Sequence, residues 1–129
     1  MKKLIFLLLA VMLLTACGQD TEKDRGAVYV NITAEEAKEI MDSQEGYIIL
    51  DVRTQEEYDE GHIPGATQIS HEEIAEKAEE MLTDKDQLIL VYCRSGRRSK
   101  IAAEALAELG YTNIREFGGI IDWPYEVEK

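Results

Sequence analysis

The fold is decided by residues 88–99, LILVYCRSGRRS. The first half of this stretch is an apolar run rich in branched side chains, which predicts a buried parallel strand ending at Cys93. A short basic loop with Gly96 follows, and a helical pattern then runs to Gly110, which is placed to cap the helix. A strand, a tight loop and a helix in that order aim several backbone N–H groups and the positive end of the helix at one point. The apolar residues at helical spacing are Ile101, Ala102, Ala105, Leu106 and Leu109.

Cys93 opens this loop, so we expect its sulfur to lie at that point. Both a helix N-terminus and nearby cations lower the pKa of a thiol and favour the nucleophilic thiolate. A buried structural cysteine at a strand end is the alternative, but the electropositive setting favours a reactive thiol. The setting comes from four cationic side chains within the next seven residues: Arg94, Arg97, Arg98 and Lys100.

The N-terminus carries a separate signal in residues 1–17. Two lysines form a short positive region, and residues 4–14 form an apolar core too short to span a bilayer as a standard helix. Residues 14–17, LTAC, resemble the lipobox of a bacterial lipoprotein signal peptide. That resemblance implies cleavage before Cys17, lipid attachment to its sulfur, and export to the outer side of the cytoplasmic membrane. An ordinary secretory signal or an uncleaved anchor is the alternative.

About 113 residues remain after such cleavage, enough for one compact domain with a hydrophobic core. Residues 18–27 are expected to form a flexible tether because they are polar and charged, and residues 28–127 are expected to form the domain. Once the two signal lysines are removed from the 14 cationic residues, twelve remain against 26 Asp and Glu, a side-chain balance of −14. Such a surface repels nucleic acid, and the cations gathered in residues 94–100 favour a small-anion site.

The cysteine and histidine content bounds other chemistry. If Cys17 carries lipid, Cys93 has no partner in the chain, and an internal disulfide is then excluded. Cys and His are too few for a structural zinc site, and His62 and His71 lack ligand-like neighbours. We therefore expect neither a metal nor another cofactor.

Short apolar runs alternate with helical patterns along the domain. Helices are expected to begin at Thr33 and Thr54, each in a capping box, and at Ser70, while Gly118 and Gly119 are expected to make a turn. Strands are predicted at residues 28–32, 47–52, 67–69, 88–93 and 113–117, and a short helical piece at residues 120–123. The inward-facing helical residues are predicted to be Ala37, Ile40 and Met41 in the first helix and Ile74, Ala78, Met81 and Leu82 in the third.

This alternation predicts an α/β domain with a mainly parallel central sheet and helices on both faces. In such sheets, ligands lie beyond the carboxyl ends of the strands. Cys93 lies at one such strand end, and the pair Asp51 and Arg53 lies at another. We therefore expect a ligand to bind at this edge of the sheet.

Four motifs follow one another between residues 28 and 125. They are Asp51-Val52-Arg53; Glu57-Tyr58 followed by Gly61-His62-Ile63-Pro64-Gly65-Ala66; Cys93-Arg94-Ser95-Gly96-Arg97-Arg98; and Gly118-Gly119 with Trp123 behind it. Each motif alone is weak, but four in this order are highly specific. Together they resemble the rhodanese family of sulfurtransferases.

The resemblance implies a sulfurtransferase that works through Cys93. The thiolate would attack a sulfane sulfur, such as that of thiosulfate, and become a persulfide. A thiophilic acceptor, such as cyanide, a thiol or a partner protein, would then take the sulfur. Arg97 and Arg98 are candidates for binding the donor anion, with a solvated cation on the first helical turn as the alternative for each. Backbone N–H groups of the loop would cradle the terminal sulfur and the donor, and the loop residues are Arg94, Ser95, Gly96, Arg97, Arg98 and Ser99.

The other residues of these motifs are expected to have supporting roles. An Asp-x-Arg pair at a strand end, such as Asp51 and Arg53, more often fixes neighbouring loops than touches substrate. His62 lies in a loop whose role in the family is structural, so no general base is assigned to it. Trp123 is expected to cover the core.

Other functions stay open beside this one. A cysteine-dependent phosphatase or arsenate reductase needs five residues between the cysteine and the arginine of its loop, whereas four separate Cys93 from Arg98. A non-turnover persulfide carrier or a regulatory rhodanese-like binding module is another alternative, and the retained Cys93 argues only against an inactive module. A redox role through a mixed disulfide at Cys93 is the third, although the chain offers no resolving cysteine.

Overall fold

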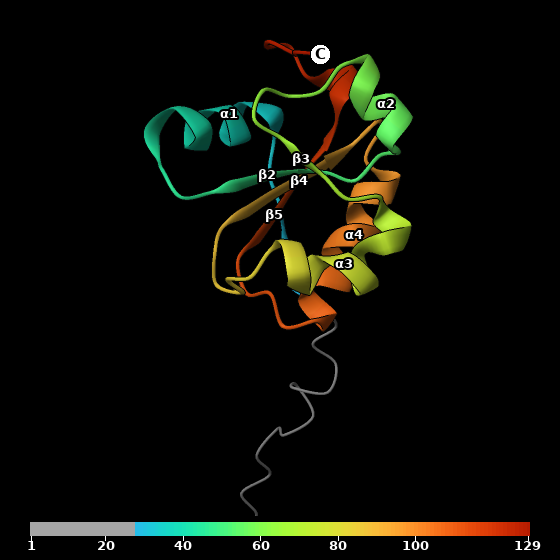
Figure 1. Cartoon of the computed structure of the whole chain (residues 1–129). Helices are drawn as coiled ribbons and strands as arrows, with labels where there is room; N and C mark the ends of the chain where they lie inside the picture. Colours follow the sequence, from blue (N-terminus) through green and yellow to red (C-terminus); the bar gives the residue numbers. More distant parts are fainter. Residues whose placement is uncertain (1–27) are drawn as a thin grey trace, which may run out of the picture.

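The computed structural model describes residues 28–129, which form a parallel sheet between two layers of helices (Figure 1). The predicted signal peptide with Cys17 and the predicted tether lie outside the described residues. The sheet has the order β1-β5-β4-β2-β3, and every neighbouring pair is parallel. Its strands are β1 (Val30–Asn31), β2 (Ile48–Asp51), β3 (Thr67–Gln68), β4 (Ile89–Cys93) and β5 (Ile114–Gly119).

Helices cover both faces of this sheet, which confirms the predicted fold class. In Figure 1, α1 lies on one side of the strands, and α3 and α4 lie on the other. Within residues 28–129, no helix is both long and apolar enough to cross a membrane. The helices are α1 (Ala34–Ser43), α2 (Gln55–Glu60), α3 (Ile74–Met81) and α4 (Arg97–Glu108), with short 3₁₀ turns η2 (His71–Glu73) and η3 (Ile120–Asp122).

The central strand β4 is buried along its whole length and divides the core in two. Ile89, Val91 and Cys93 pack into the cluster under α3 and α4. Leu90 and Tyr92 pack into the cluster under α1. Successive side chains of a strand point to opposite faces, so a run buried on both sides must be apolar throughout. The same alternation directs the Cys93 side chain toward the face that α4 covers.

Both predicted capping boxes are present. The Thr33 hydroxyl accepts the Glu36 N–H at 3.0 Å, and the Glu36 carboxylate accepts the Thr33 N–H at 3.3 Å. Thr54 and Glu57 exchange the same two bonds at the start of α2. Each box satisfies two backbone donors that a helix otherwise leaves without partners.

The predicted cap at Ser70 is wrong. Its side chain makes no capping bond, and the chain first forms η2, so that α3 begins at Ile74. The reason is that the Ser70 hydroxyl is already engaged, donating to the Arg53 carbonyl at 3.3 Å and accepting from Gln68 Nε2 at 3.1 Å. A tertiary contact therefore overrides the local capping pattern.

Two apolar residues of the predicted helical patterns are exposed. Met81, the last residue of α3, is 48% exposed, because the buried line along this helix passes through Ala78 to Leu82. Ile101 is 43% exposed, because the buried line of α4 includes Ser99 and lies on the opposite side of the helix. The sequence pattern did not reveal that a polar residue occupies the buried face of α4.

Candidate active site

Cys93 ends the central strand, and its loop turns directly into α4. The thiol is 1% exposed, and the loop closes over only three residues, from Arg94 to Gly96, before the helix begins. Gly96 has a φ of +108°, in a region that residues with a Cβ rarely adopt. This glycine lets the backbone turn sharply enough for its own N–H to reach back to the sulfur.

Hydrogen bonds from the loop surround Sγ of Cys93. The Gly96 N–H donates to the sulfur at 3.0 Å, and Oγ of Ser99 lies 3.4 Å from it. Burial raises the pKa of the thiol. Hydrogen bonds from the Ser99 hydroxyl and from the N–H groups of Ser99, Gly96 and Ser95 lower the pKa by more than burial raises it, so the pKa of Cys93 lies below its ordinary value. The loop therefore favours the thiolate.

The end of β5 presses against this loop. A Cβ built on Gly119 would stand 1.9 Å from the Arg94 carbonyl oxygen and 2.5 Å from the Ser95 nitrogen, so only glycine fits. The same carbonyl accepts the N–H of Ile121 at 3.2 Å. Gly118 and Gly119 thus belong to β5 rather than to the predicted turn, because the strand continues past a register shift to pair Gly119 with Cys93.

Arg98, which was predicted as a binder of the donor anion, forms an ion pair with Glu57 instead. Its guanidinium donates to Glu57 of α2 through two bonds, Nη1 to Oε1 at 2.7 Å and Nη2 to Oε2 at 2.9 Å. This contact is the largest cause that lowers the pKa of Glu57 to about 2. Of the four cations predicted around the thiol, Arg94, Arg97 and Lys100 stay exposed. Arg98 therefore ties α4 to α2.

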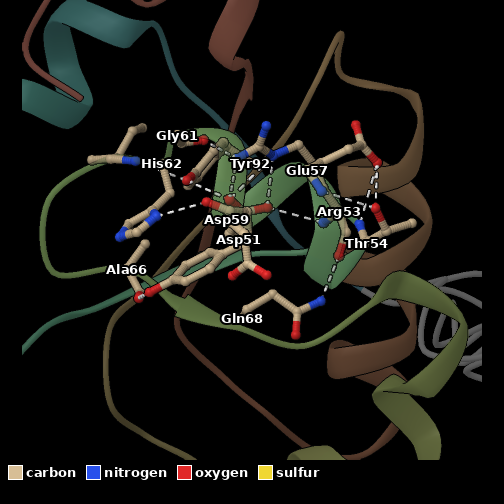
Figure 2. Close-up of polar contacts among 12 residues, drawn as sticks. Asp51, Arg53, Thr54, Glu57, Asp59, Gly61, His62, Ala66, Gln68 and Tyr92 are labelled. Carbon is tan, nitrogen blue, oxygen red and sulfur yellow. Dashed lines mark hydrogen bonds and ion pairs between the residues drawn. The ribbon is translucent and has the colours of Figure 1, made fainter. Parts of the chain in front are cut away.

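Asp51 and Arg53 form a buried ion pair beneath the loop that precedes β3 (Figure 2). Arg53 Nη2 lies 2.7 Å from Asp51 Oδ2 and also donates to the Gly61 carbonyl at 2.7 Å. The Tyr92 hydroxyl donates to Asp51 at 2.6 Å and accepts the N–H of Ile63 at 3.0 Å. Desolvation opposes the charge of Arg53, but the hydrogen bond and charge of Asp51 outweigh it, and the pKa of Arg53 is raised.

This pair links the end of β2 to β4 and to the loop at residues 61–66. Burial is the main cause that raises the pKa of Tyr92, with Asp51 second, so the phenol stays protonated as a donor. None of the hydrogen bonds of Asp51 or Arg53 involves Cys93. Both side chains hold loops in place, as an Asp-x-Arg pair at a strand end is expected to do.

His62 joins the same loop to the C-terminal segment. Its ring stacks on Tyr58 with 3.7 Å between centroids, and its Nδ1 lies 2.9 Å from the Tyr58 carbonyl oxygen. Its backbone exchanges two hydrogen bonds with Glu128, each 2.8 Å long. These contacts show that His62 has a structural role, which is to hold the loop against Tyr58 and Glu128.

Two further features bound the site. Among residues 28–129, no three His, Cys, Asp or Glu side chains are grouped as a metal ion would need. An open pocket of about 490 Å³ lies between α1 and the C-terminal segment, where Ile49, Ile63 and Trp123 line it. Those three residues belong to the core cluster on the other face from Cys93, so this pocket is separate from the thiol.

One neighbour of Cys93 was missed from the sequence. Glu116 of β5 is 2% exposed, and its Oε2 lies 2.5 Å from the Ser99 hydroxyl that contacts the sulfur. The only signal available was an acidic residue inside a predicted strand, two positions before Gly118. Glu116 lies 23 positions after Cys93 in the chain, so no local pattern could predict its contact with Ser99.

Comparisons with known proteins agree with this geometry. The family model described as a rhodanese-like domain matches residues 33–124. The thiosulfate sulfurtransferase PspE of Escherichia coli is 40% identical over 73 residues, which are 57% of this chain and 70% of that protein. The putative sulfur carrier protein YrkF of Bacillus subtilis is 35% identical over 112 residues, which are 86% of this chain but only 60% of that protein.

Solved structures show the same fold. A rhodanese with anions from E. coli has a TM-score of 0.60 and 36% identity, covering 64% of this chain and 98% of that one. A rhodanese-related protein from Thermoplasma volcanium has a TM-score of 0.67 and 33% identity, covering 78% of this chain and 98% of that one. The matched segment includes the buried strand, the cysteine loop and the paired glycines described above. This chain therefore belongs to the rhodanese-like family.

Proposed function

We propose that the chain is a sulfurtransferase that moves a sulfane sulfur from an anionic donor, such as thiosulfate, to a thiophilic acceptor through a persulfide on Cys93. One observation carries the proposal: the Cys93 sulfur lies where the Gly96 N–H donates to it at 3.0 Å, inside a loop that lowers the thiol pKa. A thiolate held by preorganised N–H donors is a strong nucleophile toward sulfur. Relatives named thiosulfate sulfurtransferase support the choice of donor.

Each half of the reaction balances. The Cys93 thiolate attacks the outer sulfur of thiosulfate, an S–S bond forms to Sγ, and sulfite leaves with the electron pair of the old S–S bond. The persulfide keeps one negative charge on its outer sulfur. Cyanide or a thiolate acceptor, free or on a partner protein, then attacks that sulfur and returns Cys93 as a thiolate. The N–H groups that favour the first thiolate also suit the persulfide anion.

The charges around the loop suit a small anionic donor. Arg94 and Arg97 are exposed at the loop and at the first turn of α4, whereas Glu57 neutralises Arg98. The chain as a whole is acidic, with a formal net charge of −12. A dianion is therefore attracted only close to the loop.

Thiocyanate formation from thiosulfate and cyanide tests the proposal. The purified full chain should turn over many times, and Cys93→Ser should not, while a Cys17→Ser chain should keep the rate. A chain that accepts one sulfur but forms thiocyanate no more than once would be a persulfide carrier. A chain that forms neither a persulfide nor thiocyanate would contradict the proposal.

We also propose that Cys17 is the site of lipid attachment and that the domain is held at the outer side of the cytoplasmic membrane. The support is the sequence of residues 1–17, with its positive start, apolar core and LTAC segment. Fractionation of expressing cells tests this. The wild type should sediment with membranes and carry a lipid on Cys17 by mass spectrometry, and Cys17→Ser should lose the lipid. An unmodified Cys17 in the mature protein would contradict it.

A further inference from the structure

Glu116 is a buried carboxylate beside the reactive thiol, and sulfur transfer as described above gives it no role. It lies on β5 with 2% of its surface exposed. Among residues 28–129, no lysine, arginine or histidine forms an ion pair with it. A buried carboxylate without a cation depends on its hydrogen bonds, so its partners indicate what it does.

Two groups bind one oxygen of this carboxylate. The Gly118 N–H donates to Oε2 at 2.8 Å, and the Ser99 hydroxyl donates to the same oxygen at 2.5 Å. Ser99 is fully buried on the first turn of α4, and its Oγ also lies 3.4 Å from Sγ of Cys93. The hydroxyl of Ser99 therefore connects the thiol to the carboxylate.

Ser99 has one hydroxyl proton, and this limits what the three side chains can do together. When Cys93 is a thiol, its S–H donates to Ser99 Oγ, and the hydroxyl donates to Glu116. When Cys93 is a thiolate, the hydroxyl serves the sulfur only by turning away from the carboxylate. The chain of hydrogen bonds is then complete only if Glu116 carries a proton and donates it to Ser99 Oγ.

We propose that Glu116 takes up the Cys93 proton through Ser99, so that the thiolate forms without adding charge to the buried site. The S–H bond of Cys93 breaks as its proton passes to Ser99 Oγ, and the hydroxyl proton of Ser99 passes to Glu116 Oε2. No electrons leave the three side chains, and their total charge stays at minus one. Glu116 is thus a positioning residue that acts on the sulfur through Ser99.

Electrostatics favours such sharing. A thiolate and a carboxylate linked through one hydroxyl in a buried site repel each other strongly when both are charged. With the proton on Glu116, the single negative charge lies on sulfur, first as the Cys93 thiolate and then as the persulfide. The buried site then keeps the same charge through both halves of the transfer.

The other charged and titratable groups near Glu116 do not neutralise it. Tyr29, before β1, has a pKa raised mainly by burial, with smaller contributions from Glu104 and Glu116. Glu104 is an exposed residue of α4, and Arg115 adjoins Glu116 on β5 but donates to a backbone carbonyl. Within the described part of the chain, these groups leave the carboxylate free to act on the thiol.

One cation faces the sulfur rather than Glu116. The pKa of Arg98 is raised mainly by its hydrogen bond to Glu57 and to a smaller extent by Cys93. Since Glu57 already pairs with it through two bonds, Arg98 is a weak counter-ion for the thiolate. The N–H donors of the loop and the proton exchange with Glu116 therefore balance the charge at Cys93.

The pH profile of Cys93 alkylation by iodoacetamide in the purified full chain tests the inference. Mass spectrometry of the separated peptides keeps Cys17 out of the measurement. Two groups that share a proton titrate in two steps, so the wild-type rate should rise in two steps and the Glu116→Gln rate in one. At neutral pH the variant should react about twofold faster or more, because the thiolate no longer shares the buried site with a second negative charge. The inference assumes the nucleophile of the proposed function, but alkylation needs no sulfur donor, so the two fail separately.

Glu104→Gln is the matched control, because it removes the same charge from the exposed side of α4 and should keep both steps. A single step in the wild type, or two steps that survive Glu116→Gln, overturns the proposal. If Glu116→Gln does not fold, infrared titration of the wild type decides. The carbonyl band of a protonated carboxyl group should be lost in two steps while Cys93 is free and in one step after it is alkylated; identical loss in both states overturns the proposal.

Discussion

Arg98 and Glu57 form a two-point ion pair that ties the first turn of α4 to α2, with both N···O distances below 3 Å. The two residues are 41 positions apart, and each side chain is mostly buried. The pair braces the helix that follows the Cys93 loop. It also occupies the guanidinium of an arginine that the sequence suggested as a binder of the donor anion.

The Glu57–Arg98 pair should stabilise the fold in a pH-dependent way. Glu57→Gln is expected to cost on the order of 1–2 kcal/mol of unfolding free energy at neutral pH. The pKa of Glu57 falls from 4.5 to about 2 on folding, so the stabilisation is complete above the unfolded value. It should disappear as the pH falls from 4.5 toward 2. Urea unfolding across this range measures the difference, and the exposed neighbour Glu56→Gln is the control; a difference that does not change with pH would contradict the assignment.

Arg97 and Arg98 should have separable roles. Arg97→Ala is expected to raise the KM for thiosulfate about three- to tenfold with little change in melting temperature, because it removes an exposed cation near the donor. Arg98→Ala is expected to lower stability, because it leaves the mostly buried Glu57 carboxylate without its partner. Steady-state kinetics and thermal unfolding of both variants decide this. An unchanged KM in Arg97→Ala together with a raised KM in a stable Arg98→Ala would reverse the roles.

Gly119 should be essential to the shape of the loop. Gly119→Ala puts a Cβ within 1.9 Å of the Arg94 carbonyl oxygen, and backbone cannot yield as a flexible side chain does. We expect a loss of several kcal/mol in stability, or a displaced loop with a thiol pKa near its ordinary value. Alkylation of Cys93 as a function of pH and urea unfolding measure both. Gly46→Ala, which has positive φ but open space around it, should cost only about 1 kcal/mol.

The buried ion pair of Asp51 and Arg53 should matter for stability and not for chemistry. Asp51→Asn leaves the Arg53 charge buried without its partner and is expected to cost about 3–5 kcal/mol. Tyr92→Phe removes only a hydroxyl and should cost about 1–2 kcal/mol. Chemical denaturation gives both values. At temperatures where the variants are folded, an unchanged KM for thiosulfate is expected, and a selective rise in KM would show that the pair contacts the donor.

Local patterns carried most of the fold. The Ile89–Cys93 strand is buried on both faces, so its apolar run was unambiguous, and the Thr33 and Thr54 capping boxes depend only on residues three positions apart. The position of Cys93 at a strand end followed from the same local run. Such features need no knowledge of what packs against them.

Features that depend on contacts between residues far apart in the chain could not be predicted from the sequence. Ser70 fits a capping pattern, but its hydroxyl donates to the Arg53 carbonyl. Ser99 lies on the buried face of α4 because its hydroxyl bonds to Glu116 on β5. The choice between Arg97 and Arg98 required knowing where Glu57 lies. In each case a tertiary contact between polar groups decides, and hydrophobic periodicity does not record such contacts.

The central claim, a persulfide on Cys93, is tested most directly by the intact mass of the purified chain after incubation with thiosulfate. The account predicts a gain of the mass of one sulfur atom. Cyanide should remove it, and Cys93→Ser should never acquire it. The contradicting result is a chain that gains no mass while Cys93 still reacts with iodoacetamide. Such a chain would have a reactive thiol without sulfurtransferase chemistry.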